Sequence, residues 1–73
     1  MTLDEGKEGK EYVVADAKLP EQLQKRMEAL GLTTGTIVKI IHKKHSGTAV
    51  ILLRGTRFAV GRGITSKINV GEV

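Results

Sequence analysis

The chain has 73 residues, a net charge of +4 and no cysteine. A chain of this length forms one small domain, which buries only about 60% of the surface that its unfolded form exposes. Without cysteine, neither disulfides nor thiolate metal sites can hold the domain together. The longest apolar run, at residues 49–53, is far shorter than the roughly 18 residues that indicate a membrane span. Since the N-terminus also lacks an apolar signal region, we expect a cytoplasmic protein.

The first ten residues, MTLDEGKEGK, are mostly polar and contain glycine. This composition predicts a loosely ordered arm over residues 1–10, followed by a first strand at residues 12–15, YVVA. Leu3 is the only large apolar residue of the arm after Met1. It is therefore the residue through which the arm can pack against the rest of the domain, which we expect to span residues 1–73.

A helix is predicted to begin at Pro20 and to end at Leu30. Leu23, Met27 and Leu30 recur at helical spacing and form one apolar stripe. Proline is tolerated at the first helical position, and the negative charge of Glu21 complements the positive end of the helix dipole.

The helix is predicted to end in a sharp corner. Gly31 stands where a C-terminal cap needs a left-handed backbone, and Leu32 is placed to contact Met27 across that cap. Gly35 can then adopt a positive φ, which lets an extended strand begin at Thr36. The structural corner therefore comprises Leu30, Gly31, Leu32 and Gly35.

Three β-prone runs follow the corner, at residues 36–42, 48–54 and 57–60, and a short one lies at residues 67–70. The turns between the first three contain glycine, as in a β-meander. The segment RGITS before the last run predicts a tight turn or a single 3₁₀ turn. The fold class is therefore mainly β with one helix, inserted after the first strand.

Both faces of the predicted sheet are partly apolar. Apolar residues are adjacent at 37–38 and 40–41 and run unbroken from Val50 to Leu53. Since successive side chains of a strand point to opposite faces, one face forms the core and the other needs a cover. We expect the helix and the arm to cover that second face, and any uncovered part to bind a partner.

These elements together resemble a known family. The segment LQKRMEALGLTTGTIVKI, then VILLRGTRFAVGR and INV, is similar to the pattern of the FeoA family of small ferrous iron transport proteins. The matching positions are Thr2, Leu3, Gly9, Leu30, Gly31, Leu32, Gly35, Thr36, Arg54, Gly55, Phe58 and Val60. Thr34 departs from the pattern, because the family usually has proline after the corner.

The resemblance implies a small SH3-like β-barrel with the helix inserted after the first strand. It also implies an accessory role in ferrous iron uptake, through binding and modulating the cytosolic GTPase part of FeoB, the membrane ferrous iron transporter. Neither the residues nor the resemblance indicates a cofactor.

Catalytic chemistry finds no support in the residues. The chain has no cysteine nucleophile, no serine spaced to meet a histidine and a carboxylate, and no paired acids in its second half. Gly61 and Gly63 lack the long loop and helix of a phosphate cradle. The sequence therefore predicts a protein that is not an enzyme.

The only two imidazoles, His42 and His45, are weak candidates for metal ligands. Two lysines between them repel a cation, and a stable site needs about three or four donors of suitable type. We expect an exposed hairpin tip here and no metal site.

Charge is uneven along the chain. Residues 1–36 carry five cationic and seven acidic side chains, whereas residues 37–73 carry seven cationic and one acidic. Such a basic half suits an acidic protein, a nucleic acid or an anionic lipid surface. The candidate partner-binding residues are cations on neighbouring strands with apolar residues beside them, namely Lys39, Ile41, Leu53, Arg54, Arg57 and Arg62.

The sequence leaves alternatives to docking on FeoB open. The main one is a small basic barrel that binds nucleic acid, which the charge favours. Against it, Tyr12 and Phe58 are the only aromatic residues that could stack on bases. A metal-sensing domain would need a better ligand set, and weak self-association is a further alternative.

Overall fold

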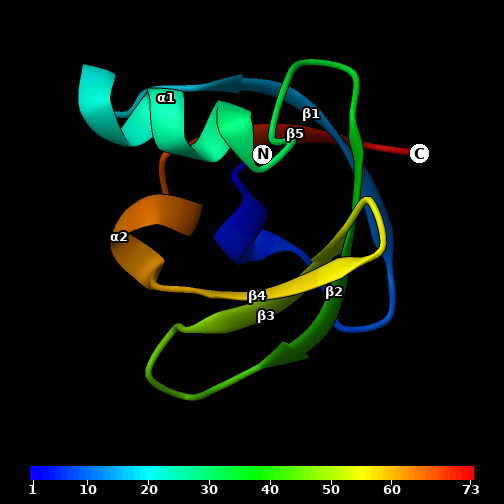
Figure 1. Cartoon of the computed structure of the whole chain (residues 1–73). Helices are drawn as coiled ribbons and strands as arrows, with labels where there is room; N and C mark the ends of the chain where they lie inside the picture. The colour runs from blue at the N-terminus through cyan, green and yellow to red at the C-terminus, as the bar shows by residue number, and fades with distance from the viewer.

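The computed structural model describes residues Met1–Val73. In chain order it contains a 3₁₀ turn η1 (Leu3–Glu5), strand β1 (Glu11–Ala17), helix α1 (Glu21–Ala29), strands β2 (Ile37–Lys43), β3 (Ala49–Leu53) and β4 (Thr56–Val60), a single helical turn α2 (Arg62–Thr65) and strand β5 (Ile68–Glu72) (Figure 1). The predicted mainly β fold, with one long helix after the first strand, is confirmed. None of the helices has the length and apolarity that a membrane crossing requires.

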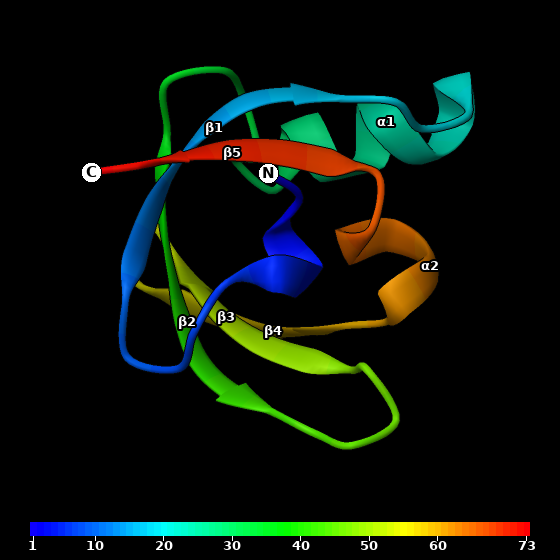
Figure 2. The same ribbon diagram turned by 180° about the vertical axis from the view of Figure 1, so that it is seen from behind.

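The five strands form one antiparallel sheet in the order β4-β3-β2-β1-β5. The sheet is strongly curved, and its edge strands β4 and β5 lie on opposite sides of an opening in which η1 sits (Figure 2). Register shifts between Val14 and Asp16 in β1 and between Ile40 and His42 in β2 add the local twist that this curvature requires. The result is an SH3-like barrel that no β4–β5 pairing closes.

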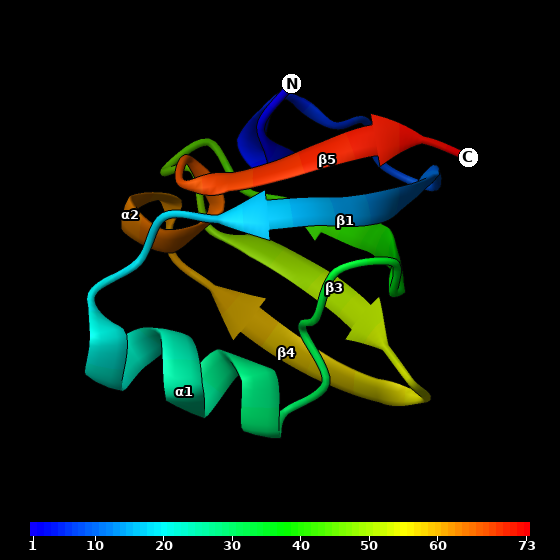
Figure 3. The ribbon, with the colours of Figure 1, turned by 90° about the horizontal axis from the view of Figure 1, so that it is seen from above.

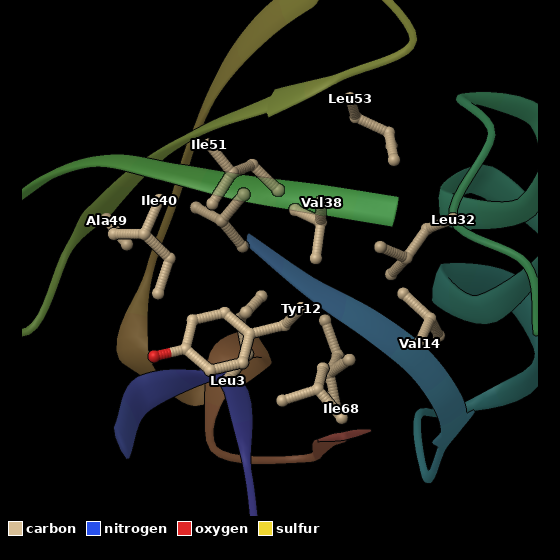
Figure 4. Packing of buried hydrophobic residues seen from close by; sticks show 12 residues of the cluster. Leu3, Tyr12, Val14, Leu32, Val38, Ile40, Ala49, Ile51, Leu53 and Ile68 are labelled. Carbon is tan, nitrogen blue, oxygen red and sulfur yellow. The ribbon is translucent and has the colours of Figure 1, made fainter. Parts of the chain in front are cut away.

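The core follows the alternation of the strands. In β3, Ala49, Ile51 and Leu53 are buried, while Val50 and Leu52 on the outer face are only half-buried. The same alternation holds in the other strands and yields one cluster of twelve buried residues (Figure 4). A chain of this size depends on such a core, because it has no disulfide to supplement it.

The N-terminal segment corrects the expectation of a loosely ordered arm over residues 1–10. Leu3 is 0% exposed and belongs to the core cluster. The Val70 N–H donates to the Met1 carbonyl at 2.8 Å, and Thr2 forms a β-bridge with Asn69. The segment is therefore held at the barrel opening from inside, since its single leucine fills space that the five strands leave empty.

The turn that inserts Leu3 is held by local contacts. The Thr2 N–H donates to the Glu5 carboxylate at 2.7 Å, and this bond, followed by that from the Thr2 hydroxyl, holds the pKa of Glu5 below its ordinary value. Gly6 follows in extended backbone, and a Cβ there would collide with Ile40 and would lie 2.8 Å from the Tyr12 ring. Glycine at this position therefore lets the chain cross directly over the core.

The corner after α1 has the predicted Schellman geometry. The Leu32 N–H donates to the Met27 carbonyl at 3.0 Å, and the Gly31 N–H donates to the Glu28 carbonyl at 2.9 Å. Gly31 has a φ of +105° and Gly35 a φ of +89°. The helix itself begins one residue later than predicted, because Pro20 is its extended N-cap.

Backbone hydrogen bonds attach the corner to β1. The Gly35 N–H donates to the Val14 carbonyl at 2.7 Å, and the Thr34 hydroxyl donates to the Ala15 carbonyl at 3.0 Å. Thr34 therefore makes a side-chain bond that proline could not make at this position. The corner and the first strand form one connected unit.

Helix α1 lies beside β4 at the barrel opening (Figure 3) and does not cover the outer face of the sheet. None of its residues is buried, and Leu30, predicted to belong to its packed stripe, is 43% exposed. The expectation that helix and arm together cover the outer face was wrong, because both lie at the opening of the barrel.

Candidate docking surface

Two of the predicted partner-binding residues, Lys39 and Arg57, lie on the outer face of the curved sheet. Lys39 of β2 pairs with Leu52 of β3, which in turn pairs with Arg57 of β4. Residues paired across neighbouring strands share a face, so the half-buried Leu52 lies in one row between the two cations. Ile41, at the bulge of β2, is half-buried.

The expectation that Leu53 is exposed was wrong, although Leu53 does line the apolar groove described below. Leu53 is only 2% exposed and pairs with Val38, which is fully buried. The unbroken apolar run of β3 does not reveal which alternate residues face the core. Leu52 is the residue of this run that the outer face presents.

Arg54 occupies the two-residue turn between β3 and β4. Arg54 and Gly55 have φ values of +51° and +80°, as a type I′ hairpin turn requires. The Arg54 stem lies over the C-terminal corner of α1, since a Cβ at Gly31 would be 2.9 Å from the Arg54 Cδ. The guanidinium group therefore stands beside the negative end of the helix dipole.

An apolar groove opens between α1, β4 and α2, with a volume of about 140 Å³. Met27 of α1 and its C-cap Leu30 form one wall, Phe58 and Val60 of β4 form another, and Ile64 of α2 contributes to the lining. Ten of its eleven lining residues are hydrophobic. The groove is therefore suited to an apolar group. No sequence pattern indicated it, because its lining comes from α1 and its corner and from β3, β4, α2 and β5, which are separate segments of the chain.

The four arginines of the chain adjoin groove residues in the sequence, but not all of them stand beside the groove in the fold. Arg57 shares the outer face of the sheet with Leu52, and the Arg62 stem lies against Gly47 in the β2–β3 turn. Arg54 and Arg26 are the two whose positions lie on the α1 side of the groove. Arg26, Arg54, Arg57 and Arg62 each directly neighbour a residue that lines the groove, and all four are exposed. None of them forms an ion pair or donates a side-chain hydrogen bond within the chain. Three of them were predicted to bind a partner, whereas Arg26, on the helix, was missed.

The histidines lie near the β2–β3 hairpin and do not converge. His42 Nδ1 is 3.1 Å from the Glu8 carboxylate, which also accepts a hydrogen bond from the Lys43 N–H at 2.8 Å. His45 lies in the turn after β2 and is exposed. No group of three or more histidine or acidic side chains is arranged to hold a metal ion.

Metal binding is therefore expected to be weak and nonspecific. Titrating manganese, as a stand-in for ferrous iron, into the labelled protein should give shallow NMR effects near His42, His45 and Glu8 that do not saturate, because two donors and nearby lysines make a poor site. Saturable binding with micromolar affinity and coherent shifts in the barrel core would contradict this expectation.

Together, the curved five-stranded sheet, the inserted helix and the groove at its opening define a small SH3-like barrel domain. Comparison with known proteins identifies its family, because the FeoA domain matches residues 1–72. The chain belongs to the FeoA domain family.

Individual relatives agree with this assignment. The chain is 31% identical over 66 residues to a protein of Methanocaldococcus jannaschii named as an Fe(2+) transport protein A, covering 90% of this chain and 79% of the relative. The NMR structure of a FeoA protein from Chlorobium tepidum superposes with a TM-score of 0.93 at 23% identity, over all of this chain and 70% of that one.

The same barrel also occurs inside longer proteins. The apo form of ScaR, a manganese-activated repressor, contains it with a TM-score of 0.86 at 23% identity, over all of this chain and 35% of the repressor. At this identity the likeness establishes the fold alone.

Proposed function

We propose that this chain is a non-catalytic cytoplasmic accessory protein of ferrous iron uptake, which docks on the cytosolic GTPase part of a FeoB-type transporter and modulates it. The observation that carries the proposal is an apolar groove with the unpaired Arg54 and Arg26 beside its α1 wall, in a member of the FeoA domain family. Interfaces combine an apolar centre with a charged rim, and this surface offers both.

The alternative, nucleic-acid binding, is favoured by the cations of the second half of the chain and weakened by the aromatics. Tyr12 is 2% exposed and its hydroxyl accepts a hydrogen bond from the Lys7 N–H at 2.8 Å. Phe58 is half-buried in the wall of the groove. Neither ring is therefore free to stack on successive bases, which is the usual source of affinity for single strands.

The test compares both partners at two ionic strengths. Binding to the purified cytosolic part of a FeoB-type transporter is expected to change little between low and moderate salt, because apolar burial supplies most of its affinity. Any binding to mixed-sequence RNA or DNA should fall steeply and linearly with the logarithm of salt concentration, because it depends on counterion release.

Arg57→Ala and Arg54→Ala serve as variants in this comparison. Loss of one arginine should mainly slow association with the transporter domain, because exposed charges steer the encounter. Tight, steeply salt-dependent binding to nucleic acid, together with no detectable interaction with the transporter domain, would contradict the docking proposal and favour the nucleic-acid alternative.

A further inference from the structure

The groove between α1, β4 and α2 has room for one large side chain. Its volume of about 140 Å³ is lined almost wholly by hydrophobic groups. Apolar cavities of about 150 Å³ in proteins stay dry and accept a guest of the size of benzene. The groove can therefore take one leucine-sized or phenylalanine-sized group, whereas it is too small for a lipid acyl chain.

The α1 wall of the groove is not fixed by deep packing. No residue of α1 is buried, Met27 is half-buried and Leu30 is 43% exposed. A wall that keeps this much apolar surface in contact with water gains free energy when a partner covers it, at roughly 25 cal/mol per Å² of apolar area. Filling the groove therefore buries surface on both the guest and α1.

The charges around the groove are almost all of one sign. Besides the four arginines, Lys67 neighbours the lining residue Ile68. Glu28 is the one acidic residue that directly neighbours a lining residue, and it lines the separate hollow on the other side of α1. A guest side chain therefore enters through a field that favours carboxylates on either side of it.

We infer that the groove receives a single bulky apolar side chain from an acidic segment of the partner, whose carboxylates pair with Arg54, which lies over Gly31 between the lining residues Leu30 and Leu32, and with Arg26, one turn before Leu30 on α1. Arginine matches a carboxylate with two parallel hydrogen bonds, and buried apolar anchors with arginines beside them dominate many interfaces. The identity of the protein that carries this segment rests on the proposed function, whereas the chemistry of the segment rests on the groove and its charges.

The first test uses short synthetic peptides and the full chain labelled with ¹⁵N. The probe is acetyl-Asp-Glu-Leu-Glu-Asp-amide, and its controls replace leucine by alanine or all four acids by lysine. We expect saturable amide shifts at Leu30, Phe58, Val60 and Ile64 with the probe, and at least about tenfold weaker binding of both controls. Vesicles that contain phosphatidylserine should not reproduce these shifts.

The second test uses two variants matched in exposure. Leu30 and Ile37 are 43% and 42% exposed, but only Leu30 lines the groove. Leu30→Asp should weaken binding of the probe by at least about tenfold, whereas Ile37→Asp should leave it unchanged. Arg26→Glu should likewise weaken binding more than Lys10→Glu does, because Arg26 lies one turn before Leu30 on α1, whereas Lys10 neighbours no lining residue. Dispersed spectra of all four variants establish that each one is folded.

The outcomes separate this inference from the proposed function. If the transporter domain binds the native chain and the Leu30→Asp variant equally well, the docking proposal stands and the groove inference is overturned. If the acidic probe binds in the groove but the transporter domain does not bind the chain, the chemistry of the groove is supported and FeoB is the wrong partner. No saturable shift with the acidic probe up to about 1 mM, or stronger binding of the lysine control, overturns the inference.

Discussion

Replacing Leu3 by alanine is expected to lower the free energy of unfolding by about 2–5 kcal/mol, because it removes a leucine side chain from a core position and leaves a cavity. Leu3 is 0% exposed and closes the barrel opening from inside. A small domain has only about 5–15 kcal/mol of total stability, so the loss is severe. Chemical denaturation by urea, followed by circular dichroism, measures it directly.

Two variants control this result. Leu3→Met nearly conserves volume and should lose less than about 1.5 kcal/mol. Leu30→Ala makes the same truncation at a position that is 43% exposed, and it should lose much less than Leu3→Ala. Equal denaturation midpoints for Leu3→Ala and Leu30→Ala would mean that the N-terminal segment does not contribute to the core.

Gly31→Val is expected to lower the free energy of unfolding by at least about 1–2 kcal/mol, because a β-branched residue is strained at positive φ. Gly31 has a φ of +105° inside the Schellman cap, and its new Cβ would also displace the Arg54 stem. The flexible stem can move aside, so backbone strain should dominate the loss. The midpoint of urea unfolding reports the change.

The matched variants separate strain from side-chain bulk. Gly31→Asn should recover part of the stability lost in Gly31→Val, since asparagine tolerates left-handed backbone better than valine does. Gly63→Val adds the same side chain in α2, where a Cβ would meet no atom within 4 Å, and should have a small effect. An unchanged midpoint for Gly31→Val would show that the helix does not depend on this cap.

The regular elements were predictable because their signals are local. The spacing of Leu23, Met27 and Leu30 is helical, and the glycine of a Schellman cap is recognisable from its neighbours. The short glycine-containing turns likewise predicted the meander of β2, β3 and β4. Each of these features depends on residues that are close together in the chain.

The N-terminal segment was mispredicted because its burial is a long-range effect. Only one leucine stands among polar residues, so hydrophobicity over a window of sequence is low. Its partners, Val70 and Asn69, are at the other end of the chain. No local sequence pattern indicates that the folded strands leave a space of the size of one leucine side chain.

The candidate docking surface was only partly recognisable in the sequence, for a related reason. Arg54, Arg57 and Arg62 were identified from charge, and each directly neighbours a groove-lining residue in the sequence, but only Arg54 lies over the corner of α1 beside the groove. Leu53 and Leu52 cannot be told apart in an unbroken apolar run, since the register set by the Arg54–Gly55 turn decides which of them faces inward. The groove itself exists only after α1, β4 and α2 have been brought together.

The pairing of the chain's two ends determines when this domain can become complete during its synthesis. Met1, Thr2 and most of β1 pair with β5, which is synthesised after the other four strands. Until β5 emerges, β1 keeps an open edge and Leu3 lacks its final neighbours, whereas the meander from β2 to β4 can already pair. Such a delay leaves apolar surface exposed in the nascent chain. The last strand of this protein therefore sets the moment at which the newly made chain is protected from aggregation.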